Sequence, residues 1–147
     1  MLASSSAKRL KAEGIHVNND IQAAEWFLNP HNDVRSCHFL EDAGTEFLVQ
    51  GLELDWCLVA WDADYRYEAN RFKHWSFKGT KWQNVKDEFQ KRYLENSYRV
   101  LLTRARQGMV IYVPLGDDTD TTRQSKYYQG VFEYLQTCGL KELLATS

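Results

Sequence analysis

The chain of 147 residues lacks several features by which large functional classes are recognised. None of its eight glycines begins a G-x-x-x-x-G-K-[ST] sequence, so the phosphate-binding loop of nucleotide-hydrolysing enzymes is absent. It has no signal peptide and no apolar run of membrane length. The three cysteines, Cys37, Cys57 and Cys138, form no C-x-x-C pair and leave one over. We therefore expect a cytoplasmic protein in a reducing compartment, with no membrane partner.

The composition is that of one folded domain spanning residues 1–147. Hydrophobic residues make up 44% of the chain and aromatic residues 14%, so apolar surface is sufficient to offset the chain entropy lost on folding. The formal net charge is -2, which does not indicate a nucleic-acid-binding protein. Any such binding therefore requires a local basic patch.

Amphipathic patterns and stop signals predict five helices. The first covers residues 7–13, after serine caps and before Gly14, and the second covers residues 21–28, from an Asp20 cap to Asn29-Pro30. Two more cover residues 82–93 and 98–105, the latter closed by Gly108. A last helix carries residues 128–135 on its apolar face and stops at residues 138–139.

Apolar runs of strand length cover residues 56–61 and 109–113, and a short strand is predicted at residues 45–47. Residues 62–81 form a loop or hairpin insertion, and residues 116–122 form a polar loop. Strands that alternate with helices predict an α/β layer architecture with a mostly parallel sheet.

A first motif, T-E-F-L-V-Q-G-L-E, covers residues 45–53. Gly51 permits a tight turn and a close approach of the backbone to a ligand. The carboxylate of Glu53 can accept hydrogen bonds from ribose hydroxyls. The alternative is that Q-G-L-E merely opens a helix or turn between two strands.

A second motif, Y-R-V-L-L-T-R-A-R, covers residues 98–106 and precedes the second apolar run. A guanidinium inserted from a neighbouring domain accelerates phosphoryl transfer by about three to five orders of magnitude, and its planar fork can bind two oxygens at once. Arg104 is expected on a rigid element, beside the strand ends where α/β sites gather. The alternative is a surface arginine favoured by the dipole of a helix C-terminus.

Residues 65–82 interleave five cations with six aromatic side chains. This mixture suits single-stranded nucleic acid, where stacking contributes about 1–3 kcal/mol per base. The residues proposed to bind are Lys73, Trp75, Lys78 and Lys81. An equally good interpretation is a β-hairpin whose aromatic rings pack on the sheet while the lysines stay solvated.

Other polar clusters give weaker signals, and we expect no metal site among them. One group lacks the glycine and glutamate of a calcium loop, which favours a solvated turn. A second group lacks the spacing of zinc ligands. A third follows the first apolar run, where catalytic carboxylates often lie, but loop capping is the interpretation we favour for it. The three groups are Asp117, Asp118 and Asp120; His31, Cys37 and His38; and Asp62 and Asp64.

The two motifs, in this order, resemble the fifth and sixth motifs in the second motor lobe of superfamily 1 helicases. The longer string T-E-F-x-x-Q-G-L-E-L-D-W, with W-D-A-D and Y-R-V-L-L-T-R-A-R-x-G-M-V-I-Y-V-P, is similar to the bacterial Schlafen-helicase-like family of P-loop ATPases. The likeness spans residues 7 to about 140. It implies a RecA-like (P-loop NTPase-type) three-layer fold with a mostly parallel sheet and helices on both faces.

The resemblance also implies roles for single residues. Arg104 matches the family's arginine finger, and Glu53 matches the residue that faces the nucleotide sugar, beside Gln50 and Gly51. Thr45 matches a threonine on the nucleic-acid side. The family's histidine is replaced by Phe47, and Arg9 lies in the region of the fourth motif.

The resemblance implies the second lobe of an ATP-dependent DNA or RNA helicase or translocase, inactive alone. Its partners would be a Walker-containing first lobe of the same polypeptide, absent here, and single-stranded DNA or RNA. ATP and Mg²⁺ would be held mainly by that first lobe. Two alternatives remain: a lobe of an ATP-driven regulatory switch without unwinding activity, and a free-standing α/β interaction domain.

Overall fold

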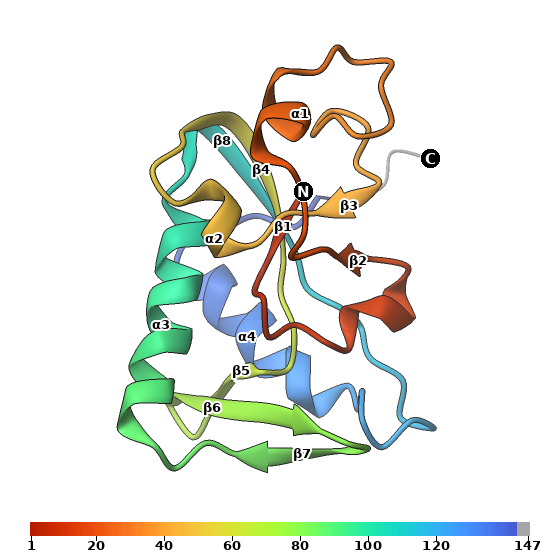
Figure 1. The fold of residues 1–147 in the computed structure, drawn as a ribbon. Helices are drawn as coiled ribbons and strands as arrows, with labels where there is room; N and C mark the ends of the chain where they lie inside the picture. The colour runs from red at the N-terminus through yellow and green to blue at the C-terminus, as the bar shows by residue number, and fades with distance from the viewer. Residues whose placement is uncertain (144–147) are drawn as a thin grey trace.

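The computed structural model describes residues 1–143 and has a mixed α/β architecture (Figure 1). Within these residues the strands form a parallel sheet of order β1-β4-β8, a parallel pair β2-β3 and an antiparallel sheet of order β5-β6-β7. The strands are β1 (Leu2–Ala3), β2 (His16–Val17), β3 (Asp42–Ala43), β4 (Leu54–Ala60), β5 (Tyr65–Glu68), β6 (Arg71–Lys78), β7 (Lys81–Asn84) and β8 (Ala105–Tyr112). The helices are the 3-10 turn η1 (Leu10–Glu13), α1 (Ala23–Leu28), α2 (Glu46–Val49), α3 (Glu88–Leu102) and α4 (Lys126–Thr137).

The central parallel sheet confirms both predicted apolar strands, although each begins earlier than expected. β4 begins at Leu54 rather than Trp56, and β8 begins at Ala105 rather than Met109. The two strands pair along most of their length, whereas β1 pairs only with the last two residues of β4. The expected α/β class with a parallel sheet is therefore confirmed for the centre of the molecule.

A single helix, α3, replaces the two helices predicted for residues 82–93 and 98–105. The Asp87 side chain accepts a hydrogen bond from the Gln90 backbone N–H at 2.8 Å, which places the N-terminal cap after the strand β7. Trp82 lies in β7 and pairs with Phe77, and Gly108 lies inside β8. The spacing of apolar residues that indicated a helix from Trp82 was misleading. The Trp82 side chain packs against Phe77 across two paired strands instead of on the face of a helix.

The N-terminal predictions are corrected in detail. Only one 3-10 turn, η1, forms within residues 7–13, although it ends at Gly14 as expected. Helix α1 follows Gln22 rather than an Asp20 cap. The strand predicted at residues 45–47 is wrong, because Thr45 precedes the short helix α2. A segment of four residues is too short to show a helical period, so apolar residues there resembled a strand.

The segment 62–81 folds as two successive hairpins rather than as a loop, and with residues up to Asn84 it makes the three-stranded sheet β5-β6-β7, called the hairpin below. Strands β5, β6 and β7 pair in antiparallel fashion, with Tyr65 opposite His74 and Phe77 opposite Trp82. This sheet lies at the lower end of the molecule in Figure 1. The mostly parallel arrangement therefore does not extend to this part of the chain.

Helices α3 and α4 pack on one face of the central sheet. Leu101 of α3 lies in a buried cluster with Cys57 and Val59 of β4, and Val131 of α4 packs with Trp61 and Tyr98. The other face is covered in part by the N-terminal segment, where Ala7 and Leu10 pack in one cluster with Ala60 and Tyr112. The last predicted helix is confirmed as α4. Among the helices of residues 1–143, none is long and apolar enough to span a membrane.

Candidate nucleotide-binding site

The two motifs meet in space, although they lie about fifty residues apart in the sequence. Because β4 and β8 are parallel, the residues that precede them are brought to the same edge of the sheet. The backbone N–H of Leu54 donates to the Arg104 carbonyl at 2.9 Å, and the Arg104 guanidinium donates to the Leu52 carbonyl at 3.3 Å. Thus the Q-G-L-E turn and the T-R-A sequence form one connected unit.

Arg104 closes the C-terminal end of α3. Its Nε donates to the Val100 carbonyl at 3.0 Å, and its Nη2 donates to the Thr103 hydroxyl at 3.1 Å. A cation is favoured there because the last carbonyls of a helix lack partners and carry partial negative charge. The side chain is partly exposed. In this structure the guanidinium is therefore hydrogen-bonded to groups at the end of its own helix.

The position of Arg104 corrects one expectation. Arg104 precedes β8, so it lies at the amino ends of the parallel strands, not at the carboxyl ends where α/β sites usually gather. The residues at the carboxyl ends are instead Ser4 after β1 and Asp62 and Asp64 after β4. The two motif segments therefore lie side by side, but at the opposite end of the sheet from these carboxylates.

The Q-G-L-E turn presents its polar groups to solvent. Gln50 ends α2, and Gly51 adopts φ 84°, a conformation that L side chains rarely reach. The Glu53 side chain is 71% exposed and lies 3.8 Å from Nε of Arg106, which is also exposed. An exposed ion pair at this distance contributes little. The Glu53 carboxylate is therefore accessible to a ligand.

Thr45 and Phe47 differ sharply in accessibility. Thr45 is 1% exposed at the start of α2, so its side chain does not reach the surface of this chain. Phe47 is 61% exposed and stands 6.1 Å from the Tyr93 ring, measured between centroids. The position that carries a histidine in the resembling helicases therefore presents an apolar ring to solvent here.

Glu46 is a residue whose importance sequence reasoning missed. Its side chain accepts hydrogen bonds from the Ser5 N–H at 2.9 Å and the Ser5 hydroxyl at 2.6 Å. It also accepts from the Tyr93 hydroxyl at 2.8 Å and the Ser97 hydroxyl at 3.1 Å. Glu46 thereby joins the N-terminal segment, α2 and α3 behind the Q-G-L-E turn. No local signal marks it, because its partners come from distant segments.

Asp62 and Asp64 are both fully buried at the carboxyl end of β4. Asp62 caps the loops around it, as expected, by accepting from the N–H groups of Arg9 at 2.9 Å and Ala63 at 2.7 Å. Asp64 instead accepts from the Tyr98 hydroxyl at 2.6 Å. Burial raises the pKa of Asp62 to about 6. Burial, together with the charge of Asp62, raises the pKa of Asp64 to about 7.

These two pKa shifts predict how stability depends on pH. Both folded pKa values exceed the usual value of 3.8, so the folded state retains protons that the unfolded chain releases. The stabilisation from the pair is complete below pH 4 and is lost as the pH rises to about 7. Asp64→Asn should remove the larger part of this decline, about 2 kcal/mol between pH 5 and pH 8. Urea unfolding of both proteins at pH 5 and at pH 8 tests this. If the free energy of unfolding falls by the same amount between these pH values in wild type and in Asp64→Asn, the prediction is contradicted.

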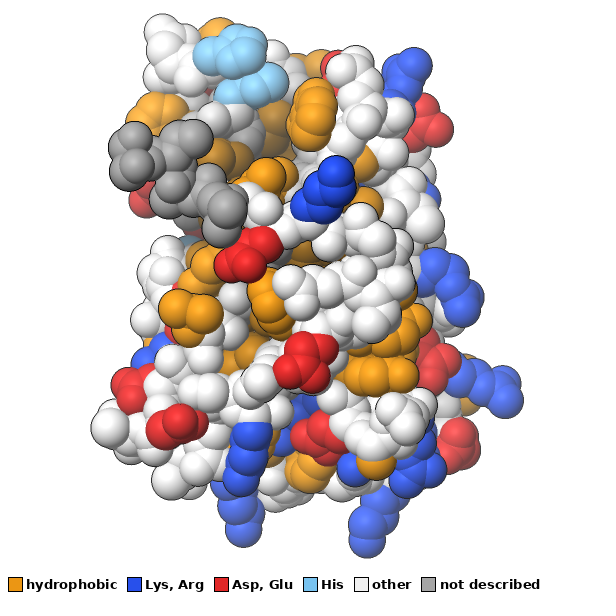
Figure 2. Space-filling view, turned by 180° about the vertical axis from the view of Figure 1, so that it is seen from behind, with side chains coloured by type: hydrophobic (Ala, Val, Ile, Leu, Met, Phe, Trp, Pro, Cys, Tyr) orange, Lys and Arg blue, Asp and Glu red, His pale blue; other side chains and the backbone are white. Residues whose placement is uncertain are grey.

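The hairpin places its aromatic rings and its lysines differently. The Arg66 guanidinium, 2% exposed, lies 4.4 Å from the Trp75 ring centroid and 3.6 Å from that of Tyr127. One face of Trp75 is therefore occupied by a cation of the same chain, which supports the hairpin-packing alternative for this residue. Lys73 pairs with Glu68 at 3.2 Å. Lys78 and Lys81 are exposed, and Lys and Arg side chains project from the lower end of the molecule in Figure 2.

The weaker candidates serve their own loops. Asp117 accepts from Thr119, Asp118 from the Ser125 N–H, and Asp120 from Thr122. Arg9, from the region of the fourth motif, pairs with Asp120 at 3.1 Å and thus lies at the carboxyl end of the sheet, away from Arg104. The rings of His31 and His38 lie against each other at a tilt of 30°, with centroids 3.8 Å apart. In the described residues, no three His, Cys, Asp or Glu side chains are grouped to hold a metal ion.

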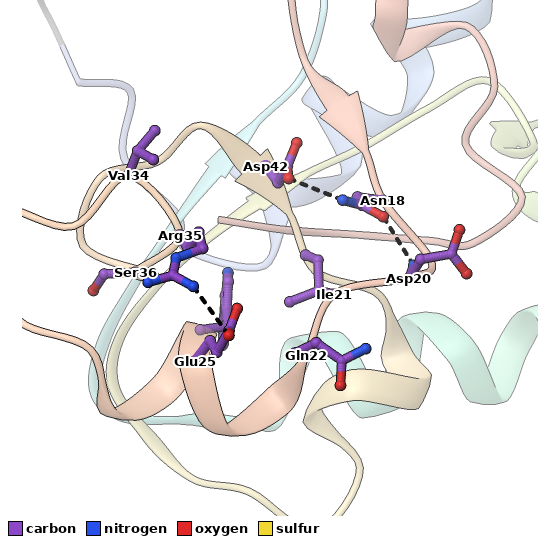
Figure 3. Close-up of a pocket in the computed structure, with 10 residues that line it drawn as sticks. Asn18, Asp20, Ile21, Gln22, Glu25, Val34, Arg35, Ser36 and Asp42 are labelled. Carbon is purple, nitrogen blue, oxygen red and sulfur yellow. Dashed lines mark hydrogen bonds and ion pairs between the residues drawn. The ribbon is translucent and has the colours of Figure 1, made fainter.

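A hollow of about 180 Å³ lies beside α1 and contains none of the predicted site residues (Figure 3). Asn18 donates to Asp42 at 2.9 Å, and Arg35 donates to Glu25 at 3.0 Å across its walls. Its polar groups therefore satisfy one another.

Residues 1–115 match a family model described as Schlafen group 3, DNA/RNA helicase domain. The chain belongs to this family. The match includes the Q-G-L-E turn, Arg104 and all strands of the central sheet. No curated protein and no solved structure matches the chain. Membership in the Schlafen group 3 helicase family supports a helicase-like function and nucleic-acid binding for this chain.

Proposed function

We propose that this chain is the second RecA-like motor lobe of an ATP-dependent DNA or RNA helicase or translocase. The observation that carries the proposal is the hydrogen-bonded meeting of the Q-G-L-E turn with Arg104 at the amino ends of β4 and β8. The chain itself has no phosphate-binding loop, so it acts only against a first lobe that supplies one.

Arg104 supplies the arginine finger in this proposal. Its present acceptors are two backbone carbonyls and a hydroxyl, which are uncharged. A γ-phosphate carries negative charge, so it attracts the guanidinium by Coulomb forces and can accept two parallel N–H···O hydrogen bonds from it. ATP held on the first lobe therefore draws the guanidinium away from Leu52 and the end of α3. Beside the γ-phosphate, the guanidinium stabilises the charge that develops on the transferred phosphoryl group.

Glu53, Gln50 and Gly51 form the sugar side of the same site. The Glu53 carboxylate is free of short hydrogen bonds within residues 1–143, and Arg106 is 3.8 Å away, so it can accept from ribose hydroxyls without losing a strong partner. In the described part of the chain, no three His, Cys, Asp or Glu side chains are grouped to hold a metal ion. We therefore assign Mg²⁺ and the phosphates mainly to the first lobe.

Nucleic acid would be bound through the hairpin lysines. Replacing Lys73, Lys78 and Lys81 with Ala should weaken binding to single strands and flatten its salt dependence, because each phosphate contact releases counterions. Replacing Trp75 should weaken binding without that change in slope. Fluorescence anisotropy at several salt concentrations measures both effects. Binding that ignores all four changes would remove the hairpin from the nucleic-acid surface.

One alternative function is favoured by a specific observation. An ATP-driven regulatory switch needs the nucleotide residues but no stacking surface on the hairpin, and Arg66 already occupies a face of Trp75. Single-strand binding and unwinding by the two-lobe protein would identify the motor. ATP turnover without either activity would identify the switch.

The experiment for the motor lobe is ATP turnover in three proteins. They are the 147-residue chain alone, a protein that joins a phosphate-loop lobe to it, and that two-lobe protein carrying Arg104→Ala. The chain alone should be inactive, since it has no cradle for the phosphates. Hydrolysis by the chain alone would overturn the proposal and direct attention to Asp62 and Asp64.

A further inference from the structure

Trp56 is a large aromatic residue that lies in a strand of the central sheet and yet is exposed to solvent. It lies inside β4, yet 65% of the residue is exposed. Its partner across the parallel pair is Gly108 of β8. The indole carbon Cζ3 lies 2.2 Å from the point that a Cβ atom at residue 108 would occupy. The ring therefore rests on the β8 backbone and needs a glycine beneath it.

The surroundings of Trp56 combine apolar and charged groups. A groove of about 660 Å³ runs beside it, with Leu58 and Val110 among its apolar walls. Glu53 and Arg106 line the same groove, and both side chains are mostly exposed. The view from behind in Figure 2 shows hydrophobic side chains at the surface in the upper half of the molecule.

We propose that Trp56, Glu53 and Arg106 form a subsite for the base and ribose of a nucleotide. An indole fixed on a strand offers a flat face for stacking at little entropic cost. The Glu53 carboxylate, three residues earlier in the chain, accepts the ribose hydroxyls, and Arg106 lies on the phosphate side. The inference rests on the proposed nucleotide role of Glu53 and adds the residue that would recognise the base.

Local charge favours a single nucleotide over a nucleic-acid strand. The carboxylates of Glu53 and Asp55 both line the groove, and Arg106 is the one Lys or Arg side chain among its described lining residues. A phosphodiester backbone running past two carboxylates would be repelled, whereas a ribose hydroxyl donates to them. An apolar peptide could fill the groove, but it would leave Glu53 and Arg106 without a role.

The test uses adenosine, which has no phosphate and so does not depend on Arg104. The indole N–H signal of Trp56 in a ¹⁵N spectrum of the 147-residue chain is assigned by its loss in Trp56→Phe. Adenosine should shift this signal, with a Kd on the order of millimolar, which is about −4 kcal/mol. Ribose 5-phosphate, which lacks the base, should shift it less than adenosine does at the same concentration. Trp56→Ala should weaken adenosine binding about five-fold or more, the effect of losing one stacked base.

Gly108→Ala is the matched variant, since it retains Trp56 but drives the indole off the strand. It should weaken adenosine binding as Trp56→Ala does, while Arg99→Ala, at an exposed arginine of α3 that does not line the groove, should not. If Gly108→Ala does not fold, the comparison of Trp56→Phe with Trp56→Ala decides, because phenylalanine retains a stacking face.

Equal binding of adenosine to wild type and Trp56→Ala would overturn the subsite, as would equal shifts with ribose 5-phosphate. Tight binding of a single-stranded oligothymidylate through Trp56, without adenosine binding, would also overturn it and identify nucleic acid as the occupant. If adenosine does not bind at Trp56 but ATP turnover of the two-lobe protein still depends on Arg104, the subsite is overturned and the motor proposal stands. Adenosine binding with turnover indifferent to Arg104 would instead overturn the motor proposal.

Discussion

Arg104→Ala should slow ATP turnover roughly several hundred-fold or more in a protein that joins a phosphate-loop lobe to this chain. The guanidinium lies at the end of α3, next to the Q-G-L-E turn, and is held there only by uncharged acceptors. Its loss removes charge stabilisation in the transition state, so kcat should fall while the Kd for ATP changes little. Phosphate release at saturating ATP measures the first, and calorimetry measures the second.

The controls separate chemistry from folding. Arg104→Lys keeps the charge but loses the planar fork, so it should restore only part of the activity. Arg99→Ala is the matched substitution, because Arg99 is an exposed arginine of α3 that bonds to Asn96. It should leave turnover unchanged. Thermal unfolding of all three proteins shows whether Arg104 also stabilises the end of α3. A turnover number unaltered by Arg104→Ala would remove this residue from the mechanism.

Glu46→Ala should lower the free energy of unfolding by about 3 kcal/mol, the scale expected when a buried charged acceptor is removed and its donors remain. Glu46 is 5% exposed and accepts from Ser5, Tyr93 and Ser97. After truncation, the Ser5 N–H and the hydroxyls lose their acceptor in a site with little access to water. Urea unfolding of the 147-residue chain, with the slope held constant, measures the loss.

Glu41→Ala provides the comparison, since Glu41 is an exposed glutamate in the same region. Its effect should stay within about 0.5 kcal/mol, as for most surface substitutions. Glu46→Gln should lie between the two, because the amide keeps one acceptor oxygen but adds a donor that must be satisfied. A Glu46→Ala protein as stable as Glu41→Ala would show that the four hydrogen bonds contribute nothing net.

The elements that could be predicted are those whose signal is local. The apolar runs around Val59 and Val110 specify buried strands, and α4 shows a clear helical period with a stop at Gly139. The helix boundary at Asp87 was missed because Trp82 fits a helical period and a strand equally well. Where two periodicities compete over a few residues, cross-strand partners decide the outcome, and these partners are distant in the sequence.

The candidate site follows the same division. The family, the two motifs Q-G-L-E and T-R-A, and the lack of a phosphate-binding loop can all be read from short contiguous stretches of amino acids. The location of Arg104 at the amino ends of the strands became visible only in the folded chain. The same is true of the burial of Glu46 among four hydrogen-bond donors and of the full burial of Asp62 and Asp64. The physical reason is that hydrogen-bond partners and burial are set by segments that meet only after the chain has folded.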